Sequence, residues 1–224
     1  MARLGRPVPR VFAWLLVCLT WELGVQVVHT AFPRLTGRRD PDGREEDFLA
    51  MRLHSRLAYL YWFYSGKVTC AWTHLRGLNL AERYPPSAEL GQAYSEHAPV
   101  ATMVPLFGRA LKYAKRSQEI RRDGGDIWGQ GQSQSFAGVA LYAASRFDEA
   151  EEACREAIRL LQSTGDQWEV NTAGWTLAMC LHRKGHLREA AATARGVYES
   201  AVASGDQTSA GVGLSVWTRT AWDE

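Results

Sequence analysis

Gly125-Asp-Ile-Trp-Gly129 and Gly165-Asp-Gln-Trp-Glu169 begin with the same dipeptide at a spacing of 40 residues, and Gly205-Asp206 repeats it at that spacing. A second pair of matching segments, Ala144–Ala150 and Lys184–Ala190, is also 40 residues apart. Similarity at a fixed period of this length is typical of stacked helical hairpins. The sequence therefore predicts an all-α, right-handed solenoid of antiparallel helical hairpins with a repeat of roughly 40 residues.

The Gly-Asp pairs have a physical reason to recur. A glycine directly after a helix can adopt the left-handed conformation that ends it. The aspartate that follows can accept a backbone N–H bond at the start of the next helix. Asp166 also has Glu169 three residues later, which is the capping-box arrangement. We therefore expect one helix to end and the next to begin within two residues at each Gly-Asp pair.

Small residues recur in the same register. The first helices of the expected hairpins carry them at Ala58, Ala98, Gly138 and Ala178, and the second helices at Cys70, Ala110, Ala150 and Ala190. Small side chains let two antiparallel helices approach closely, so we expect these positions to lie at the crossing point of each hairpin. Large apolar residues such as Leu141, Leu177 and Leu181 are expected to fill the space around them.

One joint of the array is built differently, by Tyr84-Pro-Pro-Ser87. Two prolines cannot continue a helix, and Ser87 can cap the helix that follows, with Leu90 on its inner side. Pro99 and Pro105 lie further along the same segment, so we expect that helix to be kinked or broken.

The most hydrophobic part of the chain is Val11–Thr30, and three interpretations of it compete. A signal peptide would explain the arginines before it, but the stretch has no small-residue cleavage site near its end. A membrane-spanning helix is long enough, but Glu22, Gln26 and His29 fall on one helical stripe, and an unpaired carboxylate inside a bilayer is costly. A soluble amphipathic helix would pack its broad apolar side on the solenoid or on sequence upstream. The last interpretation is the one we favour.

The polar, breaker-rich stretch Thr36–Arg44 reads as a linker. The expected organisation is therefore an apolar N-terminal helix in residues 1–35, a linker in 36–44, and a repeat array of about four hairpins plus one helix in 45–224. The last repeat opens at Asp206 and has room for one helix only, so we expect the chain to be a fragment.

These repeats resemble the tetratricopeptide family, which places small residues in both helices of each hairpin. They differ from it in the 40-residue length and in having Gly-Asp where the family has a proline. Asn79–Pro86, Ala93–Pro99 and Asp126–Gln132 also resemble the helical region downstream of the ATPase module in large multidomain bacterial signalling proteins. The resemblance implies a sensing or scaffolding segment of a signalling ATPase or kinase, whose own catalytic parts are absent from this chain.

The sequence offers little catalytic chemistry. A net charge of +2 gives no reason to expect nucleic acid as a partner. The chain has no phosphate-binding GxxxxGK[ST] motif, and four separated cysteines form no CxxC. Cys70 with His74, and His182 with His186, are too few for a zinc site. We therefore expect no catalytic, cofactor-binding or metal-binding residues and a non-catalytic protein. The alternatives are a membrane-anchored signalling subunit with one N-terminal transmembrane helix and, second, an enzyme of unrecognised type.

A partner surface is expected on the first helices of the hairpins. Tryptophans recur two residues after the capping aspartate, and solenoids present first-helix side chains along a groove. The residues expected to bind a partner are Trp128, Gln132, Ser135, Trp168, Asn171 and Trp175. The expected partner is a protein, a peptide or another domain of a parent protein. The expected location is cytoplasmic, with a single span of the inner membrane through residues 11–30 as the alternative.

Overall fold

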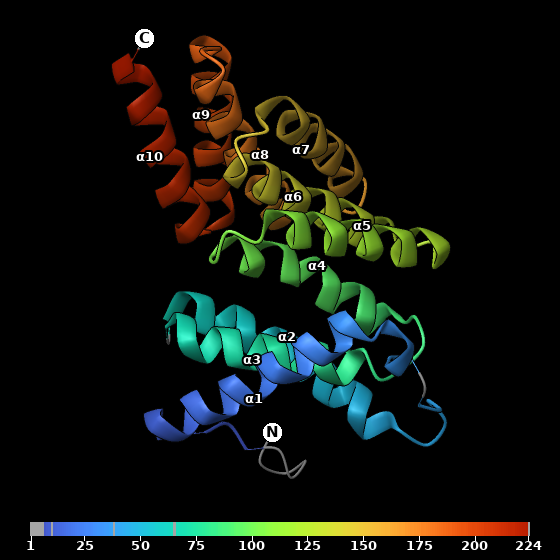
Figure 1. Cartoon of the computed structure of the whole chain (residues 1–224). Helices are drawn as coiled ribbons and strands as arrows, with labels where there is room; N and C mark the ends of the chain where they lie inside the picture. The colour runs from blue at the N-terminus through green and yellow to red at the C-terminus, as the bar shows by residue number, and fades with distance from the viewer. Residues whose placement is uncertain (1–6, 10, 38, 65, 224) are drawn as a thin grey trace. The chain divides into compact units, whose positions relative to one another are not determined.

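The structure is a computed structural model that describes residues 7–9, 11–37, 39–64 and 66–223. Within these ranges every regular element is a helix, which confirms the predicted all-α class (Figure 1). The chain divides into two compact units, Met1–His97 and Ala98–Glu224, and the division falls within helix α4. The two units are described separately below.

The first unit holds α1 (Phe12–Ala31), the short 3-10 helix η2 (Pro33–Leu35), α2 (Glu45–Tyr64), α3 (Lys67–Ala81) and most of α4 (Ala88–Thr102). The second holds the end of α4 and then α5 (Phe107–Asp123), α6 (Ile127–Ala143), α7 (Phe147–Gln162), α8 (Gln167–Arg183), α9 (Leu187–Ser204) and α10 (Gln207–Asp223). Helices α6, α8 and α10 begin at the same spacing as the Gly-Asp pairs.

Helices that are consecutive in the sequence of the second unit are also neighbours in space. Each helix from α5 to α10 packs against the next one along the chain. In addition, α6 contacts α8, and α8 contacts α10 (Figure 1). Contacts between neighbouring and next-neighbouring helices therefore account for the packing of this unit.

The glycines of the Gly-Asp joints have the predicted left-handed conformation, but the predicted break of two residues occurs only at Gly205-Asp206. Three residues separate α5 from α6 and four separate α7 from α8, because a further turn precedes Gly125 and Gly165. Gly125, Gly165 and Gly205 all have left-handed backbone conformations, with φ of +68°, +75° and +73°. A side chain with a Cβ would be strained there, which explains the glycine. Ser145 (φ +60°) and Gly185 (φ +80°) adopt the same conformation at the turn inside each hairpin.

The aspartates of these joints cap the next helix, as predicted. Asp126 Oδ1 accepts a hydrogen bond from the backbone N–H of Gly129 at 2.8 Å. Asp166 Oδ1 accepts one from the N–H of Glu169 at 3.1 Å. The third aspartate, Asp206, accepts from the N–H groups of the second and third residues after it, both at 3.1 Å. Each joint thus ends one helix and caps the next.

The recurring small residues are buried at helix crossings, also as predicted. Ala150, Ala178 and Ala190 are fully buried, and Gly138 has so little space that a Cβ there would lie 2.5 Å from Cys154 Sγ. The members of the set in the other repeats, Ala58, Ala98, Cys70 and Ala110, are buried as well. Ala190 packs with Leu177, Leu181 and Cys154, which form one of the apolar clusters between α7, α8 and α9.

The segment around α4 matches the expectation in part. Ser87 Oγ accepts from the N–H of Leu90 at 3.2 Å, and Leu90 is buried. Pro99 lies inside α4, which continues past it to Thr102. Pro105 falls in the turn before α5, so the helix ends ahead of this proline and not at Pro99.

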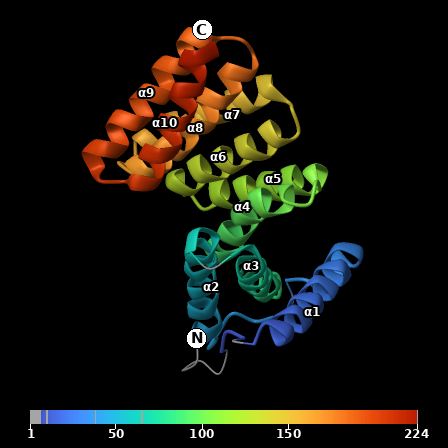
Figure 2. The ribbon, with the colours of Figure 1, turned by 90° about the vertical axis from the view of Figure 1, so that its left-hand side faces the viewer.

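In the first unit α3 lies between α1 and α2 (Figure 2). Most of α3 is buried, and α2 approaches it closely at Gly77, where an added Cβ would lie 2.9 Å from His54 Cβ. The described residues of the predicted linker, 36–37 and 39–44, form no helix, but the linker is hydrogen-bonded to the residues that follow α3. Gly37 N–H donates to Glu82 O and Arg39 N–H to Arg83 O, both at 2.8 Å. The predicted domain boundaries stay a prediction.

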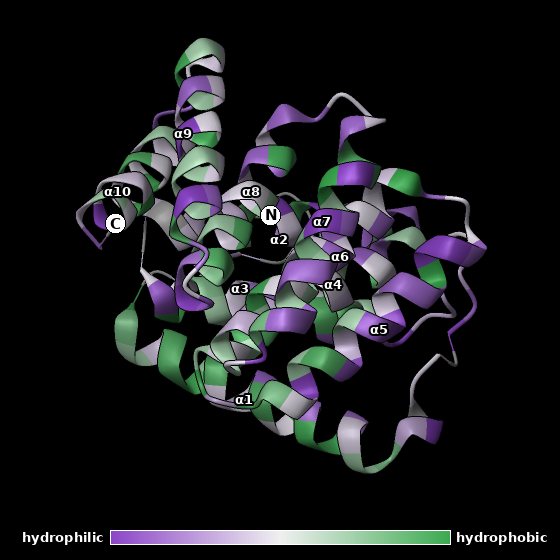
Figure 3. Cartoon of the chain, turned by 90° about the horizontal axis from the view of Figure 1, so that it is seen from above, coloured by the Kyte–Doolittle hydropathy of each residue, from purple (hydrophilic) through white to green (hydrophobic). Residues whose placement is uncertain are grey.

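Helix α1 packs with the opposite side from the one expected. Its buried residues are Leu15, Glu22 and Gln26. The large apolar side chains of the helix and its ends are exposed instead: Val11, Phe12, Trp14, Leu16, Val17, Trp21, Leu23, Val27, Val28 and Phe32. Figure 3 colours the backbone by hydropathy and shows hydrophobic residues along α1. The expectation that the broad apolar side packs on the solenoid was wrong, because the polar stripe finds partners on α3, whereas its packing on sequence upstream stays a prediction. Among the described residues, α1 is also the one helix long and apolar enough to cross a membrane, with a mean hydropathy of 1.4.

Ala190→Trp should make the hairpin of α8 and α9 less stable than it is in the parent protein. The site is fully buried, and an inserted indole forces its neighbours apart at a cost of about 1–3 kcal/mol or more. Ala192→Trp, on the exposed side of the same helix, is the matched control. Circular dichroism melts should show a lower midpoint for the first variant only, and equal midpoints would contradict the crossing described here.

Candidate functional site: the cavity beside α1

A seam of buried polar side chains joins α1 to α3. Glu22 is 3% exposed, and its two carboxylate oxygens accept from Arg76 Nη1 at 2.8 Å and from Asn79 Nδ2 at 2.6 Å. Asn79 Nδ2 also donates to the backbone carbonyl of Glu22 at 3.0 Å. The carboxylate is therefore both charge-paired and hydrogen-bonded, which a buried charge requires.

The seam continues along both helices. Gln26 Nε2 donates to Asn79 Oδ1 at 2.5 Å and to Glu82 Oε2 at 2.8 Å. His29 Nδ1 lies 2.7 Å from the same Glu82 oxygen. Separating α1 from α3 without water would leave these groups unsatisfied in an apolar setting, which costs several kcal/mol. The seam therefore fixes the rotation of α1 and directs its apolar side outward.

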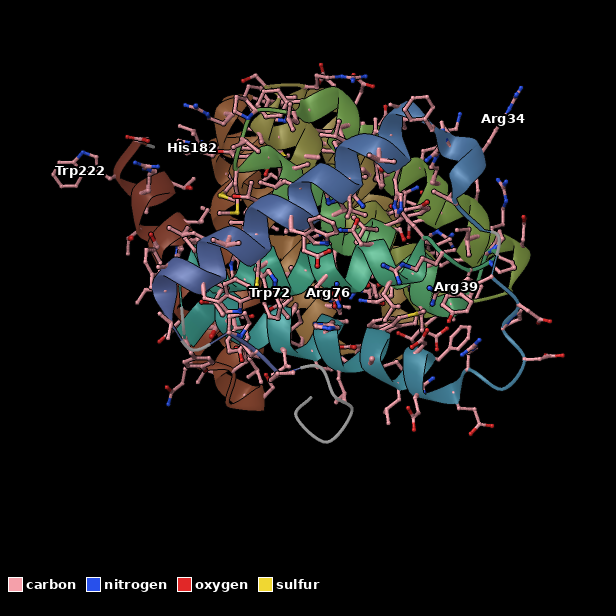
Figure 4. The ribbon with its side chains drawn as sticks, turned by 60° about the horizontal axis from the view of Figure 1, so that its bottom comes forward. Arg34, Arg39, Trp72, Arg76, His182 and Trp222 are labelled. Atoms are coloured by element: carbon pink, nitrogen blue, oxygen red, sulfur yellow. The ribbon has the colours of Figure 1, made fainter. Side chains whose placement is uncertain are left out.

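A cavity of about 700 Å³ lies beside the seam, which is within the range of small-molecule pockets. Its lining comes from the segment before α1 and from α1, α2 and α3: Pro7, Val8, Pro9, Trp14, Val17, Cys18, Trp21, Glu22, His54, Trp72 and Arg76. Three tryptophans make the wall largely apolar, and Trp72 packs edge-on against His54 with centroids 6.1 Å apart. Figure 4 shows Trp72 and Arg76 on α3, with α1 on one side and α2 on the other.

The other end of this region is basic. A smaller cavity of about 70 Å³ is lined by Arg76, Asn79, Leu80 and Arg83, so Arg76 belongs to both cavities. Burial lowers the pKa of Arg83, and the neighbouring charges of Arg39 and Arg76 lower it further. Arg76 is paired with Glu22, and Arg39 with Asp47 at 3.7 Å.

Arg83 differs from these two arginines. It is half-buried, and its guanidinium group has no hydrogen bond or ion pair with any residue that the structure describes. The carboxylates that favour its charge are Glu22 and Asp47. Arg83 therefore has two guanidinium groups and two carboxylates among its charged neighbours, and it forms an ion pair with none of the described residues.

The six residues expected to bind a partner lie in the second unit, on α6 and α8. Gln132, Ser135 and Asn171 are buried, at 3%, 0% and 2% exposure. Gln132 Nε2 donates to Glu169 Oε1 at 2.7 Å, which directs the Glu169 carboxylate toward α6. Gln132 Oε1 accepts from Arg121 at 3.3 Å, so the glutamine links α5, α6 and α8.

The three tryptophans of the expected surface are half-buried. Trp128 Nε1 donates to Asp166 Oδ2 at 2.8 Å, so this indole binds the capping aspartate of the next repeat. Trp168 and Trp175 meet edge to face on α8 with centroids 6.5 Å apart. Their role as a partner surface stays a prediction.

Cysteine and histidine side chains of the first unit contact one another or the core. Burial raises the pKa of Cys70 to about 11, so its thiol is a weak nucleophile at neutral pH. His74 Nε2 lies 3.0 Å from His97 Nδ1, with the two rings stacked. Over the residues that the structure describes, no group of three or more His, Cys, Asp and Glu side chains is placed to hold a metal ion.

The seam and the basic end could not be located from the sequence analysis. The stripe of Glu22, Gln26 and His29 was visible, but its partners Asn79 and Glu82 lie more than 50 residues away. A usable signal was present in α3, because Arg76, Asn79 and Glu82 recur every three residues, which places them on one side of the helix.

Comparison with protein families and with curated proteins gave no match for this chain.

Asp166→Ala should lower the free energy of unfolding by more than Asp206→Ala does. Both variants lose a helix cap, worth about 1 kcal/mol. Asp166→Ala also removes the hydrogen-bond acceptor of the Trp128 indole. Leaving this N–H group without an acceptor adds about 1–3 kcal/mol to the loss of stability. Urea unfolding of the two variants should show the larger loss of free energy for Asp166→Ala, and equal losses would mean that the indole contact contributes nothing.

Proposed function

We propose that Ala98–Glu224 is a tetratricopeptide-like solenoid and serves as a non-catalytic protein-interaction segment. The observation that supports this most is the succession of contacts from α6 to α8 to α10, with the same Gly-Asp joint before each helix. First helices in direct succession present one continuous face, and helical-repeat proteins bind partners on such faces. The parent signalling ATPase stays a prediction from the resemblance.

The aromatic pair on α8 is the part of that face best suited to a partner. Trp168 and Trp175 are both partly exposed and stand edge to face, so they offer a rigid apolar surface. Tryptophan is enriched among residues that carry binding energy. Gln132, Ser135 and Asn171 are buried between helices, where they support the position of this surface. The expected partner is a peptide segment with an apolar anchor.

Selection of phage-displayed peptides on the full chain tests this proposal. We expect selected peptides to bind in the micromolar range and to lose about tenfold or more in affinity to a Trp168→Ala, Trp175→Ala double variant. Trp222→Ala is the matched control, because Trp222 is 90% exposed and lies outside the surface (Figure 4). Peptides that bind both variants equally, or the failure to select any, would count against the proposed surface.

A second function is favoured by α1, which we propose contacts a membrane. Its exposed apolar side chains include Trp14 and Trp21, at 59% and 69% exposure, and exposed Arg34 follows the helix. Tryptophan and arginine are the residues that anchor helices at a lipid surface. Because Glu22 is paired with Arg76, the carboxylate that argued against lipid contact carries no unpaired charge.

The seam also distinguishes a helix that lies on the membrane from one that spans it. The partners of Glu22 and Gln26 belong to α3, which packs against α2 on its other side. A spanning α1 would have to break this seam or draw α3 into the hydrocarbon. A helix in the plane of the interface keeps the seam and buries its apolar side in lipid, so we favour this arrangement.

Flotation with vesicles of phosphatidylcholine and phosphatidylglycerol tests the membrane contact. The full chain should float with the vesicles and be released by alkaline carbonate, because an interfacial helix is extractable. A Trp14→Ser, Trp21→Ser double variant should float several-fold less, whereas Trp222→Ser should float as the parent does. Retention after carbonate would indicate a span, and absence from the vesicle fraction would contradict membrane contact altogether.

A further inference from the structure

The region along α3 in the first unit has an apolar end and a basic end. Trp72 and Arg76 are four residues apart on one side of α3, and Arg83 lies in the turn that follows Ala81, the last residue of the helix. From Trp72 to Ala81 the helix rises by about 14 Å. Trp72 lines the large cavity and Arg83 the small one, while Arg76 lines both. The two cavities are therefore neighbours and differ in chemistry.

The apolar end suits a hydrocarbon or aromatic body. Apart from Glu22, His54 and Arg76, the residues of the large cavity are tryptophan, valine, proline and cysteine. Glu22 and Arg76 neutralise each other at 2.8 Å, so the cavity has no uncompensated charge of its own. Burial of an apolar group there is favourable in proportion to the area removed from water.

The basic end suits an anion. Arg83 is the one guanidinium group of the cluster without an ion pair among the described residues, although it lies beside Arg39 and Arg76. Burial and, after it, the neighbouring charges of Arg39 and Arg76 lower the pKa of Arg83, so its positive charge is costly where it lies. A bound oxyanion would remove that cost and accept hydrogen bonds from the planar guanidinium fork.

We infer that the first unit binds an amphiphile with an oxyanion head, with its apolar body in the tryptophan-lined cavity and its head at Arg83 and Arg76. This site is separate from the peptide surface proposed on α8. It shares Trp14 and Trp21 with the exposed side of α1, but it selects the charge of the head and not lipid in general. Phosphate esters and carboxylates share the chemistry that the site recognises.

Isothermal titration of the full chain with decyl phosphate, below the concentration at which it forms micelles, tests the inference. We expect saturable binding, and we expect decanoate to compete with it. Decyltrimethylammonium, which has the same tail and a positive head, should bind at least tenfold more weakly. Inorganic phosphate alone should also bind more weakly, because it lacks the apolar body. If decyltrimethylammonium binds as tightly as decyl phosphate, the placement of an anionic head at Arg83 and Arg76 is wrong. If inorganic phosphate binds as tightly as decyl phosphate, the placement of an apolar body in the tryptophan-lined cavity is wrong.

The decisive variant is Arg83→Gln, which removes the charge without breaking a hydrogen bond among the described residues. Its affinity for decyl phosphate should fall by about tenfold or more, and Arg83→Lys should retain most of it, because loss of a charge-assisted hydrogen bond is a loss of this size. Arg219→Gln, exposed on α10, is the matched control. Equal thermal melts of parent and Arg83→Gln establish that folding is unchanged, and an unaltered affinity of Arg83→Gln would overturn the inference.

Discussion

The first unit depends on the hydrogen bonds between Glu22 and Asn79 and their continuation through Gln26 to Glu82. These bonds hold a strongly apolar helix by its only polar stripe. Two further features follow from that choice of side: the apolar residues of α1 are exposed, and the cavity forms between Trp14 and Trp21 of α1 and Trp72 of α3. A helix docked through its apolar side would bury the residues that we assign to lipid contact, and it would leave the Glu22 carboxylate without its partners on α3.

The second unit obeys a different constraint, because its order comes from local signals that repeat. Left-handed glycines end helices, and the aspartates that follow cap the next ones, so each hairpin is positioned by the residues at its own joints. Buried small residues such as Ala150 and Ala190 then set how closely the helices approach. Polar side chains add contacts from one repeat to the next, as Gln132 does with Glu169. Because each helix of this unit packs against the next one along the chain, we expect a change in one hairpin to act mainly on the hairpins beside it.

These two constraints explain what could be predicted from the sequence. The Gly-Asp joints, the Ser87 cap and the buried small positions depend on residues close together in the chain, and the structure confirms them. The side on which α1 packs was predicted wrongly, because counting apolar residues cannot detect partners on α3 that lie more than 50 residues away. For the same reason Arg83 was not among the expected site residues, since only the fold brings Arg39 beside it. Side chains expected in a groove, such as Asn171, are buried between helices, where a polar residue can also serve packing.

The measurement that tests the docking of α1 most directly is a double-mutant cycle on Glu22→Leu and Asn79→Leu in the full chain. Glu22→Leu removes the acceptor of both Asn79 and Arg76, and Asn79→Leu removes a partner of both Glu22 and Gln26, whereas in the double variant both members of the Glu22–Asn79 pair are apolar. If the seam holds α1 as described, the free energies of unfolding will be non-additive, with a coupling energy of about 1–3 kcal/mol and a double variant less destabilised than the sum of the singles. Additivity within about 0.5 kcal/mol would contradict the contact, and with it the outward orientation of the apolar side.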